Sequence, residues 1–552
     1  MQETHGGILR YRAGMRAVLR NVMLAWSCSW TLTLGVTAVP ADARAETILR
    51  RGNDAEPESL DPHRAGSHWE NAILGDMFLP LTTEDAKADP IPGAAQRWTT
   101  SPDGLTWTFT LRPGQVWSDG EPLKASDFVF GFRRVLDPKT ASRYAFIQYA
   151  IKNAEKVNAG KLPTDQVGVR ALDDSTLEII LEKPTPFLPG LLAHYTAYPI
   201  PEHAVRKYGD DWVKPGVMVS NGAYTLTEWV PHDHIALRKN PKFYDAANVA
   251  IDTVQFIPLE VESTAFARYR AGQIDAFLGK YGFPIDDMPI INRDFPGQAH
   301  VVPQLAIDYI VGNVRKPPFS DARTRRAVSL CLDRELLTEK VIKAGAVPAY
   351  SFVPPGTAGY HNAAQLDFKD WPMDRRRAEA RRLLAEAGYT AQHPLEFEFR
   401  TMALPNTRRV IITAAALLQE CGIVPHIFLS ESKVYYTALQ MFDFTLGVAA
   451  WGADYNDPLT FLSLLDSRAG PYNYQGYANQ AYDRMMDEAQ NTQDLDLRAG
   501  ILAKAEQLAL DESGVIPLAV SSYRELVAPH VKGYAENATS THRTRWMRIE
   551  RP

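Results

Sequence analysis

The residue that we single out first as a possible ligand-binding group is Asp454. It lies in residues 451–458, Trp-Gly-Ala-Asp-Tyr-Asn-Asp-Pro, a short segment of small and aromatic residues directly after an apolar run. A lone carboxylate in such a place can pair with a cation of a bound ligand, or it can cap a turn or a helix. Trp451 can likewise stack on a ligand or close a hydrophobic core. The segment therefore indicates a cation site, with structural roles as the alternative.

Two other motifs point weakly to catalysis or metal binding. Ser430 and Lys433 fit the S-x-x-K pattern of some serine hydrolases, but no Lys-Thr-Gly motif follows them. His232 and His234 could bind a metal ion, yet no second pair of ligands has metal-site spacing. The sequence contains neither a phosphate-binding glycine loop nor an H-E-x-x-H motif. We therefore expect no catalytic residues, no metal and no cofactor.

The elements around Asp454 predict a parallel sheet. Residues 394–401 and 423–429 read as strands, and a helical pattern over 407–420 separates them. A further apolar strand is predicted over 442–451. Strand, helix and strand in this order form a βαβ unit with parallel strands. Ligands of such sheets bind beyond the carboxyl ends of the strands, which is where Asp454 falls.

The rest of the chain predicts a mixed α and β protein of several domains. Strand patterns at 105–112, 176–181 and 225–229 occur in the first half, and helices start at Asp321 and Asp333 and run over 374–388. The 552 residues suggest about three or four domains. With 45% hydrophobic residues the chain is globular, and a net charge of −6 gives no basic excess for nucleic acid.

The first 45 residues predict an export signal. Four arginines (Arg10, Arg12, Arg16 and Arg20) precede an apolar run over 22–38, and Ala43-Arg-Ala45 offers a cleavage site. Cleavage there would leave Glu46 as the first residue; retention as a membrane anchor is the alternative. Only Cys331 and Cys421 remain after cleavage. The sequence allows two alternatives for this pair, two buried free thiols or one disulfide.

Many further segments, taken in chain order, resemble one known family. They include Leu60-Asp-Pro-His63, Trp117-Ser-Asp-Gly120, Val219-Ser-Asn-Gly-Ala-Tyr224, Tyr269-Arg-Ala-Gly-Gln-Ile-Asp275 and Ala453-Asp-Tyr-Asn456. This series is similar to the periplasmic oligopeptide-binding proteins of bacterial ABC importers, the peptide and nickel class of solute-binding proteins. The resemblance covers essentially the whole chain after residue 45.

The resemblance implies an α/β fold of the periplasmic-binding-protein type, with two lobes, a hinge and an extra third domain. Domain I would comprise 46–79, 204–305 and 522–552, domain II 80–203, and domain III 306–521. The ligand would lie between the lobes. Also implied are a periplasmic, monomeric and non-enzymatic receptor, and the permease subunits of an ABC importer as partners.

The resemblance also implies which residues bind the ligand. Peptide-binding members grip the main chain of a peptide between two protein segments. The corresponding residues in this chain are Ala450, Trp451, Gly452, Ser67, His68 and Trp69. Asp454 falls on the acceptor of the ligand's amino group, and Tyr144 and Tyr309 match aromatic positions of the cleft.

One departure from the enteric oligopeptide receptors concerns the other end of the ligand. Where they place an arginine that meets the carboxylate of a short peptide, this chain has Val448. Their paired cysteines are absent too. We therefore expect an oligopeptide whose far end is held differently. A receptor for a murein peptide, an opine or a sugar is the alternative, and a hydrolase built on Ser430 and Lys433 is a third hypothesis.

Overall fold

The computed structural model describes residues 46–550, with the exception of 281, 344, 362, 363 and 404. The predicted export signal and its cleavage site lie outside the described residues. From Glu46 onward the chain forms one compact unit. Within the part described, none of the helices combines the length and the apolar character that crossing a membrane requires.

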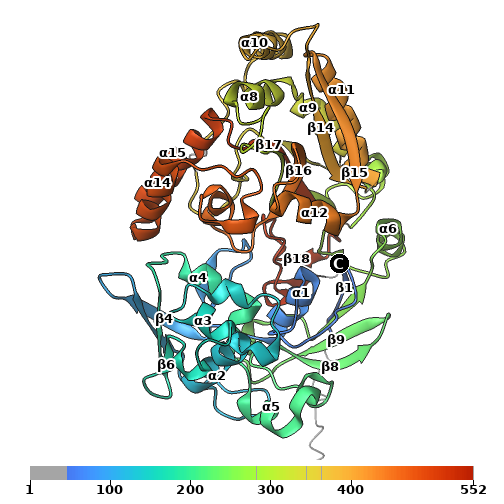
Figure 1. Cartoon of the computed structure of the whole chain (residues 1–552). Helices are drawn as coiled ribbons and strands as arrows, with labels where there is room; N and C mark the ends of the chain where they lie inside the picture. The colour runs from blue at the N-terminus through green and yellow to red at the C-terminus, as the bar shows by residue number, and fades with distance from the viewer. Residues whose placement is uncertain (1–45, 281, 344, 362–363, 404, 551–552) are drawn as a thin grey trace, which may run out of the picture. The chain divides into compact units, whose positions relative to one another are not determined.

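A large mixed sheet, eleven strands in the described part of the chain, connects distant segments (Figure 1). Its order is β15 (Ile423–Ser430), β14 (Leu395–Met402), β16 (Leu446–Gly452), β12 (Ala299–Gly312), β17 (Ile516–Val527), β11 (Ala276–Phe277), β1 (Ile48–Asn53), β10 (Thr253–Pro258), β9 (His234–Lys239) and β8 (Tyr224–Val230), with β13 (Val347–Pro348) paired to β17. A second sheet has the order β4 (Ala95–Thr100), β5 (Thr106–Leu111), β7 (Thr176–Ile180) and β6 (Val169–Ala171).

The helices include α1 (His68–Met77), α2 (Ala125–Leu136), α4 (Leu188–Leu191), α8 (Ala322–Cys331), α10 (Met373–Glu386), α11 (Pro405–Gln419), α12 (Ser432–Gln440), α13 (Leu459–Leu462), α14 (Gln480–Asn491) and α15 (Leu495–Asp511). Shorter elements include α3 (Ala154–Asn158), α5 (Glu202–Tyr208), α6 (Glu262–Arg270), α7 (Met288–Asp294), α9 (Arg334–Leu336), β2 (Thr82–Glu84), β3 (Pro90–Pro92), β18 (Val531–Lys532) and β19 (Arg548–Ile549).

The predicted βαβ unit is confirmed, with one boundary in error. Strands β14 and β15 are parallel over their full length and α11 connects them. The strand predicted over 442–451 begins only at Leu446. Phe442 has φ +57, a left-handed conformation that a strand cannot contain, and its carbonyl accepts a hydrogen bond from Asn313 Nδ2 (3.0 Å). Residues 442–445 therefore form a turn.

The helices predicted from local signals are found, and they bring the two cysteines together. Helix α8 starts after the Asp321 cap as predicted, and the segment after Asp333 continues as α9 and a π-helix over Leu337–Ile342. Cys331 ends α8, and Cys421 follows α11. The two form a disulfide with their Cα atoms 6.3 Å apart. Of the two alternatives left open by the sequence, the structure has the disulfide.

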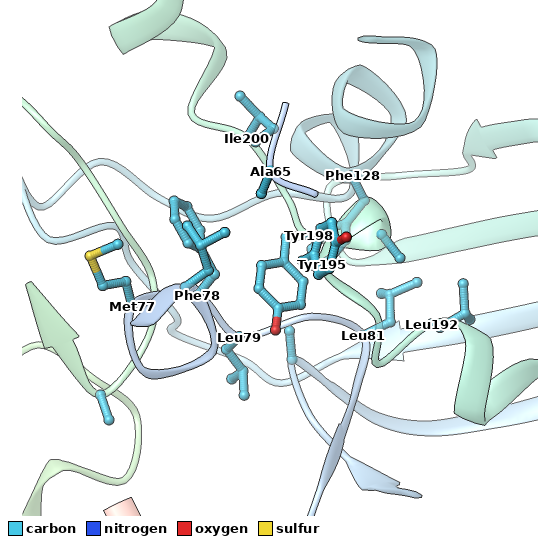
Figure 2. Close-up of a cluster of buried hydrophobic side chains, with 14 of the residues drawn as sticks. Ala65, Met77, Phe78, Leu79, Leu81, Phe128, Leu192, Tyr195, Tyr198 and Ile200 are labelled. Atoms are coloured by element: carbon cyan, nitrogen blue, oxygen red, sulfur yellow. The ribbon is translucent and has the colours of Figure 1, made fainter. Parts of the chain in front are cut away.

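Hydrophobic side chains gather in three clusters. One contains residues of α1, α2 and the second sheet, another lies among α8–α15 and β12–β17, and a smaller third contains Phe266 and Phe277. Figure 2 shows part of the first cluster, in which Met77 and Phe78 come from one segment and Tyr195 and Tyr198 from another. The two long strands β12 and β17 contribute residues to, or pack against, more than one cluster and connect them.

Candidate functional site

A cavity of about 770 Å³ lies at the end of β16. It collects residues from parts of the chain that are far apart in sequence. They come from the loop into α1 (Gly66, Ser67, His68 and Trp69), from Tyr144, from the region of α4 (Phe187, His194 and Tyr195), from β12 (Gln304 and Leu305), from the end of β16 and the loop after it (Gly452, Asp454, Tyr455 and Asp457), and from α15 (Arg498). Five of the predicted ligand residues outside β16 thus share one cavity: Ser67, His68, Trp69, Tyr144 and Asp454.

Asp454 enters this cavity without a cationic partner. Its backbone N–H donates to Thr460 Oγ1 (3.3 Å), which fixes the loop, while its carboxylate forms no salt bridge with any described residue. Burial raises the pKa of Asp454 to about 6, because removing the carboxylate from water disfavours its charged form. The half-buried Asp454 carboxylate therefore lacks a partner that would offset its partial loss of water.

The positive groups that line the cavity are already engaged. Arg498 makes two hydrogen bonds of 2.7 Å to Asp457, and its guanidinium lies 4.9 Å from the centre of the Phe187 ring. His68 Nε2 lies 2.6 Å from Asp54 Oδ2. Burial lowers the pKa of His194 to about 3, so that side chain is neutral near pH 7. The cavity thus contains a carboxylate that can bind a cation, and no described positive group is bound to it.

The outer edge of β16 is open next to Asp454. Ala453 N–H donates to Leu305 O in β12 (2.7 Å). By strand alternation, the odd-numbered residues of β16 direct their N–H and C=O groups toward β12, and the even-numbered residues direct theirs to the opposite side. Strand β14 pairs with β16 only as far as Gly447. At Val448 the Tyr435 hydroxyl accepts the outward N–H (2.7 Å) and donates to the carbonyl.

Beyond Val448, the outward N–H and C=O groups belong to Ala450 and Gly452. Both residues are exposed, and a Cβ placed on Gly452 would meet nothing within 4 Å. On the side away from β12, no strand in the described residues pairs with this stretch. An extended chain could therefore hydrogen-bond to it as an added strand, because an unpaired strand edge presents a row of free donors and acceptors.

The loop that faces this edge across the cavity is held by one buried carboxylate. Glu70 accepts hydrogen bonds from the backbone N–H of Ser59 (2.9 Å) and Gly66 (2.7 Å) and from the Ser67 hydroxyl (3.1 Å). Ser67 is extended, with φ −144 and ψ 156, just before α1 begins. The indole Nε1 of Trp69 is buried and has no hydrogen-bond partner among described residues. The Trp69 indole N–H is thus a buried donor without an acceptor among the described residues.

Aromatic rings form much of the remaining wall. The ring of Tyr144 lies 5.9 Å from that of His194 and 6.0 Å from that of Tyr195. Phe187 and Tyr455 stack with their centroids 5.3 Å apart. Burial and the charge of Asp454 raise the pKa of Tyr144, so its hydroxyl stays neutral. Neutral aromatic walls suit a ligand of mixed polarity and add no competing cation.

Three predicted site residues do not line this cavity: Ala450, which is exposed on the strand edge, Trp451 and Tyr309. Trp451 lines a second cavity of about 460 Å³ that shares Asp454, Tyr455 and Phe187 with the first, and its Nε1 donates to Thr460 Oγ1 (3.4 Å). Tyr309 is 1% exposed, packs against Phe352 in the core and lines neither cavity. The structure thus brings Trp451 next to Asp454 but does not bring Tyr309 to the site.

Sequence reasoning missed Gln304, which lines the first cavity. Its side chain is 5% exposed, and its amide Nε2 has no hydrogen-bond partner among described residues. The signal was present: Gln304 and Asp308 are polar residues with even spacing in an otherwise apolar run. Alternation alone does not place both residues on one face, because the pairing of β12 with β17 is irregular between Pro303 and Ile307.

The motifs for catalysis and metal binding do not gather partners in the described residues. Ser430 ends β15, and its hydroxyl is buried with no hydrogen-bond partner, while the side chain of Lys433 lies outside the described part. His234 contacts Asp233 and Glu228 at the exposed end of a hairpin. No group of three or more His, Cys, Asp or Glu side chains with metal-binding geometry occurs in the described residues.

Comparison with known proteins gives consistent matches over nearly the whole chain. The oligopeptide-binding protein OppA of Escherichia coli is 35% identical over 529 residues, which cover 94% of this chain and 96% of OppA. The probable deoxycholate-binding periplasmic protein YgiS of the same organism is 36% identical, covering 92% of this chain and 95% of YgiS. The murein peptide-binding protein MppA of E. coli is 34% identical, covering 93% and 95%.

Solved structures agree with these sequence matches. The unliganded open form of MppA has a TM-score of 0.85 at 34% identity, covering 92% of this chain and 98% of that one. Haemophilus influenzae OppA in complex with the peptide RPPGFSPFR has a TM-score of 0.72 at 33% identity, covering 92% and 99%. The sequence profile of the bacterial extracellular solute-binding proteins, family 5 (middle), matches residues 89–473. The chain therefore belongs to family 5 of the bacterial extracellular solute-binding proteins.

Proposed function

We propose that this protein captures oligopeptides by their free amino terminus and delivers them to the permease of an ABC importer. The observation that carries the proposal is Asp454, a half-buried carboxylate without a cation beside an open strand edge. The ammonium group of a peptide would supply the missing charge. Relatives that bind oligopeptides and murein peptides support the same class of ligand.

The open edge of β16 accounts for binding without selection of one sequence. Ala450 and Gly452 would bond to the main chain of the peptide, and the extended segment at Ser67 would face it from the opposite side. Main-chain hydrogen bonds give affinity that does not depend on side chains. The far end of the peptide would not find an arginine, because the residue at that place is Val448. Affinity should then depend mainly on the amino end.

The domain division proposed from the resemblance remains a proposal, and the two long strands support it. Its boundaries at 305/306 and 521/522 fall within β12 and β17, which connect the hydrophobic clusters. A change of angle at these strands would open and close the cavity. The open form of MppA resembles this chain more closely (TM-score 0.85) than a second MppA structure does (0.73), which supports an open arrangement here.

Location and assembly follow from the same proposal. We expect a monomer without enzymatic activity that is exported to the periplasm and starts at Glu46. Sequencing the amino terminus of periplasmic protein tests the export step. A protein that keeps residues before 46 would replace cleavage with membrane anchoring.

Calorimetry tests peptide capture. Protein stripped of ligand is titrated with tetra-alanine and with N-acetyl-tetra-alanine, using the wild type and Asp454→Asn. We expect the free-amine peptide to lose about 2–5 kcal/mol of binding free energy in the variant, the range for breaking a desolvated charge pair. The acetylated peptide should bind weakly to both proteins. Equal affinity of both proteins for tetra-alanine would contradict the proposal.

A non-peptide solute is the second candidate, because one relative is named as a probable deoxycholate-binding protein. Deoxycholate is an anion without an amine. It would bring its carboxylate into a cavity whose uncompensated charge is already negative, which costs free energy. Mass spectrometry of the ligand released from the denatured native protein separates the candidates. An opine, a sugar or a bile acid in place of a peptide would favour the second.

A further inference from the structure

A row of side chains on β12 flanks the open edge of β16. In the ladder between these strands, Ala306 lies opposite Gly452 and Asp308 lies opposite Ala450. The odd-numbered residues of this stretch (Leu305, Ile307 and Tyr309) belong to the hydrophobic core. The even-numbered ones therefore share the other face, which is the face of Ala450 and Gly452, because residues opposite each other in a ladder point to the same side.

Asp308 is an acid on this face without a salt bridge in the described structure. Its one hydrogen bond comes from the Ser521 hydroxyl and is long, at 3.4 Å. Its side chain is partly exposed. Burial raises the pKa of Asp308 to about 6 and outweighs the opposing charge of Lys280. Asp308 thus resembles Asp454: each is a carboxylate without a salt bridge beside the same strand.

A second observation concerns Gln304, which lies four residues before Asp308 on β12 and lines the first cavity. It is 5% exposed, and its buried amide Nε2 has no hydrogen-bond partner among the described residues. A buried donor without a partner costs free energy until something accepts its hydrogen bond. Strand β12 therefore carries one unmet donor in the cavity and one unpaired acid further along.

The residues between the open edge and Asp308 are small. A ligand strand paired to β16 would lie about 10 Å from β12, two strand spacings away. On β16, the side chain between its residue opposite Ala450 and Asp308 would be the methyl group of Ala450, and a Cβ on Gly452 would meet nothing within 4 Å. Lys280 and Tyr436 also lie near enough to Asp308 to interact with its charge. A long, flexible side chain can cross this gap over Ala450, whereas a short one cannot. Lysine, with a four-carbon stem and an ammonium head, has this shape.

We propose that Asp308 is a second cation site, which selects peptides with a basic side chain on the residue that lies opposite Ala450. The inference rests on the proposed peptide function and names a class of peptide within it. With the amino group at Asp454 and the first residue opposite Gly452, the residue opposite Ala450 is the third. Its neighbours point to the other face of the sheet, so the preference should be confined to that position.

The test is a position scan with tetra-alanine in which one residue at a time is replaced by lysine or by norleucine, which has the same stem without the charge. Calorimetry at pH 7.5 gives each affinity for the wild-type protein. We expect lysine at the third position to bind roughly tenfold more tightly than norleucine there, the equivalent of one charge-assisted hydrogen bond. Diaminopropionic acid, whose ammonium sits on a single methylene, should show no such gain.

Two variants locate the effect. Asp308→Asn should abolish the lysine preference and leave the affinity for tetra-alanine unchanged, whereas Asp454→Asn should weaken every free-amine peptide. Asp443→Asn, which removes an equal charge from the exposed turn before β16, is the matched control and should change neither.

The outcomes distinguish the second cation site from the proposed peptide capture on which it rests. If tetra-alanine does not bind the wild-type protein, both hypotheses are refuted. If tetra-alanine binds but lysine and norleucine are equivalent at every position, or if the preference survives in Asp308→Asn, only the second cation site is overturned. The comparison of lysine with norleucine uses the wild-type protein, so it does not depend on how the variant folds.

Discussion

The affinity for a neutral peptide should fall as the pH drops below about 6. In the ligand-free protein, burial raises the pKa of Asp454 to about 6, so the carboxyl group is protonated at lower pH. A peptide ammonium group binds the ionised form, which lowers the pKa of Asp454 in the complex. Binding below pH 6 must therefore expel a proton from Asp454, and the free energy of that step is subtracted from the affinity.

The size of the effect follows from the pKa. One unit below it, about a tenth of the protein carries the ionised carboxylate, so the dissociation constant should be roughly tenfold higher at pH 5 than at pH 7. About one proton should be released for each peptide bound at pH 5, and almost none from this group at pH 7. Above pH 8 the affinity should fall again, because a peptide amino group has a pKa of about 8 and loses its charge there.

Several other ionisable groups in the cavity keep one charge state across this window, and His68 is already held by Asp54 (2.6 Å). The pKa of His194 is lowered to about 3, and burial raises the pKa values of Tyr144, Tyr195 and Tyr455. Asp308 also has a pKa of about 6, but a peptide with alanine side chains brings no cation to it. The acid limb of the profile should thus report Asp454.

The assay is calorimetry of tetra-alanine from pH 5 to 9, in two buffers with different ionisation enthalpies, which gives the number of protons released. Asp454→Asn should remove the acid limb and the proton release at pH 5. An affinity that stays constant between pH 5 and 7 in the wild type, or an acid limb that persists in Asp454→Asn, would refute the assignment of the ammonium group to Asp454.

Four further predictions test the strand edge, the carboxylate, the disulfide and the hinge. Ala450→Pro removes the outward N–H and should reduce tetra-alanine affinity about tenfold, whereas Ala450→Ser, which keeps it, should not. In ligand-free protein, Asp454→Asn should raise the free energy of unfolding at pH 7 by about 1–3 kcal/mol and by less at pH 4, because a folded-state pKa above the unfolded value means that stability falls as pH rises between the two; denaturant titrations with no difference between the pH values would contradict this. The double variant Cys331→Ser/Cys421→Ser, which opens a link across 90 residues, should lower that free energy by about 2–5 kcal/mol in the same measurement without changing peptide affinity. Small-angle scattering should show a smaller radius of gyration when peptide is added, and an unchanged radius at saturation would count against a hinge.

Local sequence signals correctly predicted those helices and strands whose bounds are set by residues near them in the sequence. The β14–α11–β15 unit follows from hydrophobic periodicity and a glycine stop at Gly422, both of which act within a few residues. The predicted start of β16 at residue 442 was wrong, because the turn at Phe442 is held by Asn313, 129 residues away in the sequence. The disulfide could not be decided either, since it depends on where two helices end in space.

The site shows the same division between local and distant information. Asp454 could be proposed because a rule about strand ends and a family resemblance agree on it. Which β12 residue meets a ligand depends on the parity of the strand, and the resemblance pointed to Tyr309, which lies in the core. The ladder with β16 instead puts Asp308 on the side of the open edge, and Gln304 lines the first cavity. The alternation of polar residues could have shown which side chains of β12 point away from the core, but only with the knowledge that one face of this strand is covered.

In the proposed function, the unpaired state of Asp454 is what allows its carboxylate to bind a cationic ligand. An arginine or lysine placed beside it would stabilise the ligand-free protein, as Arg498 does for Asp457 with two hydrogen bonds of 2.7 Å. That cation would then have to be displaced whenever a peptide arrived, and the free energy of the pair would be lost from binding. Leaving Asp454 alone reduces stability in the empty state, where the cavity still admits water. The same carboxylate gains a partner only when a cationic ligand enters. The free energy that its loss of water costs in the empty state is then offset in the occupied state, which favours the occupied state.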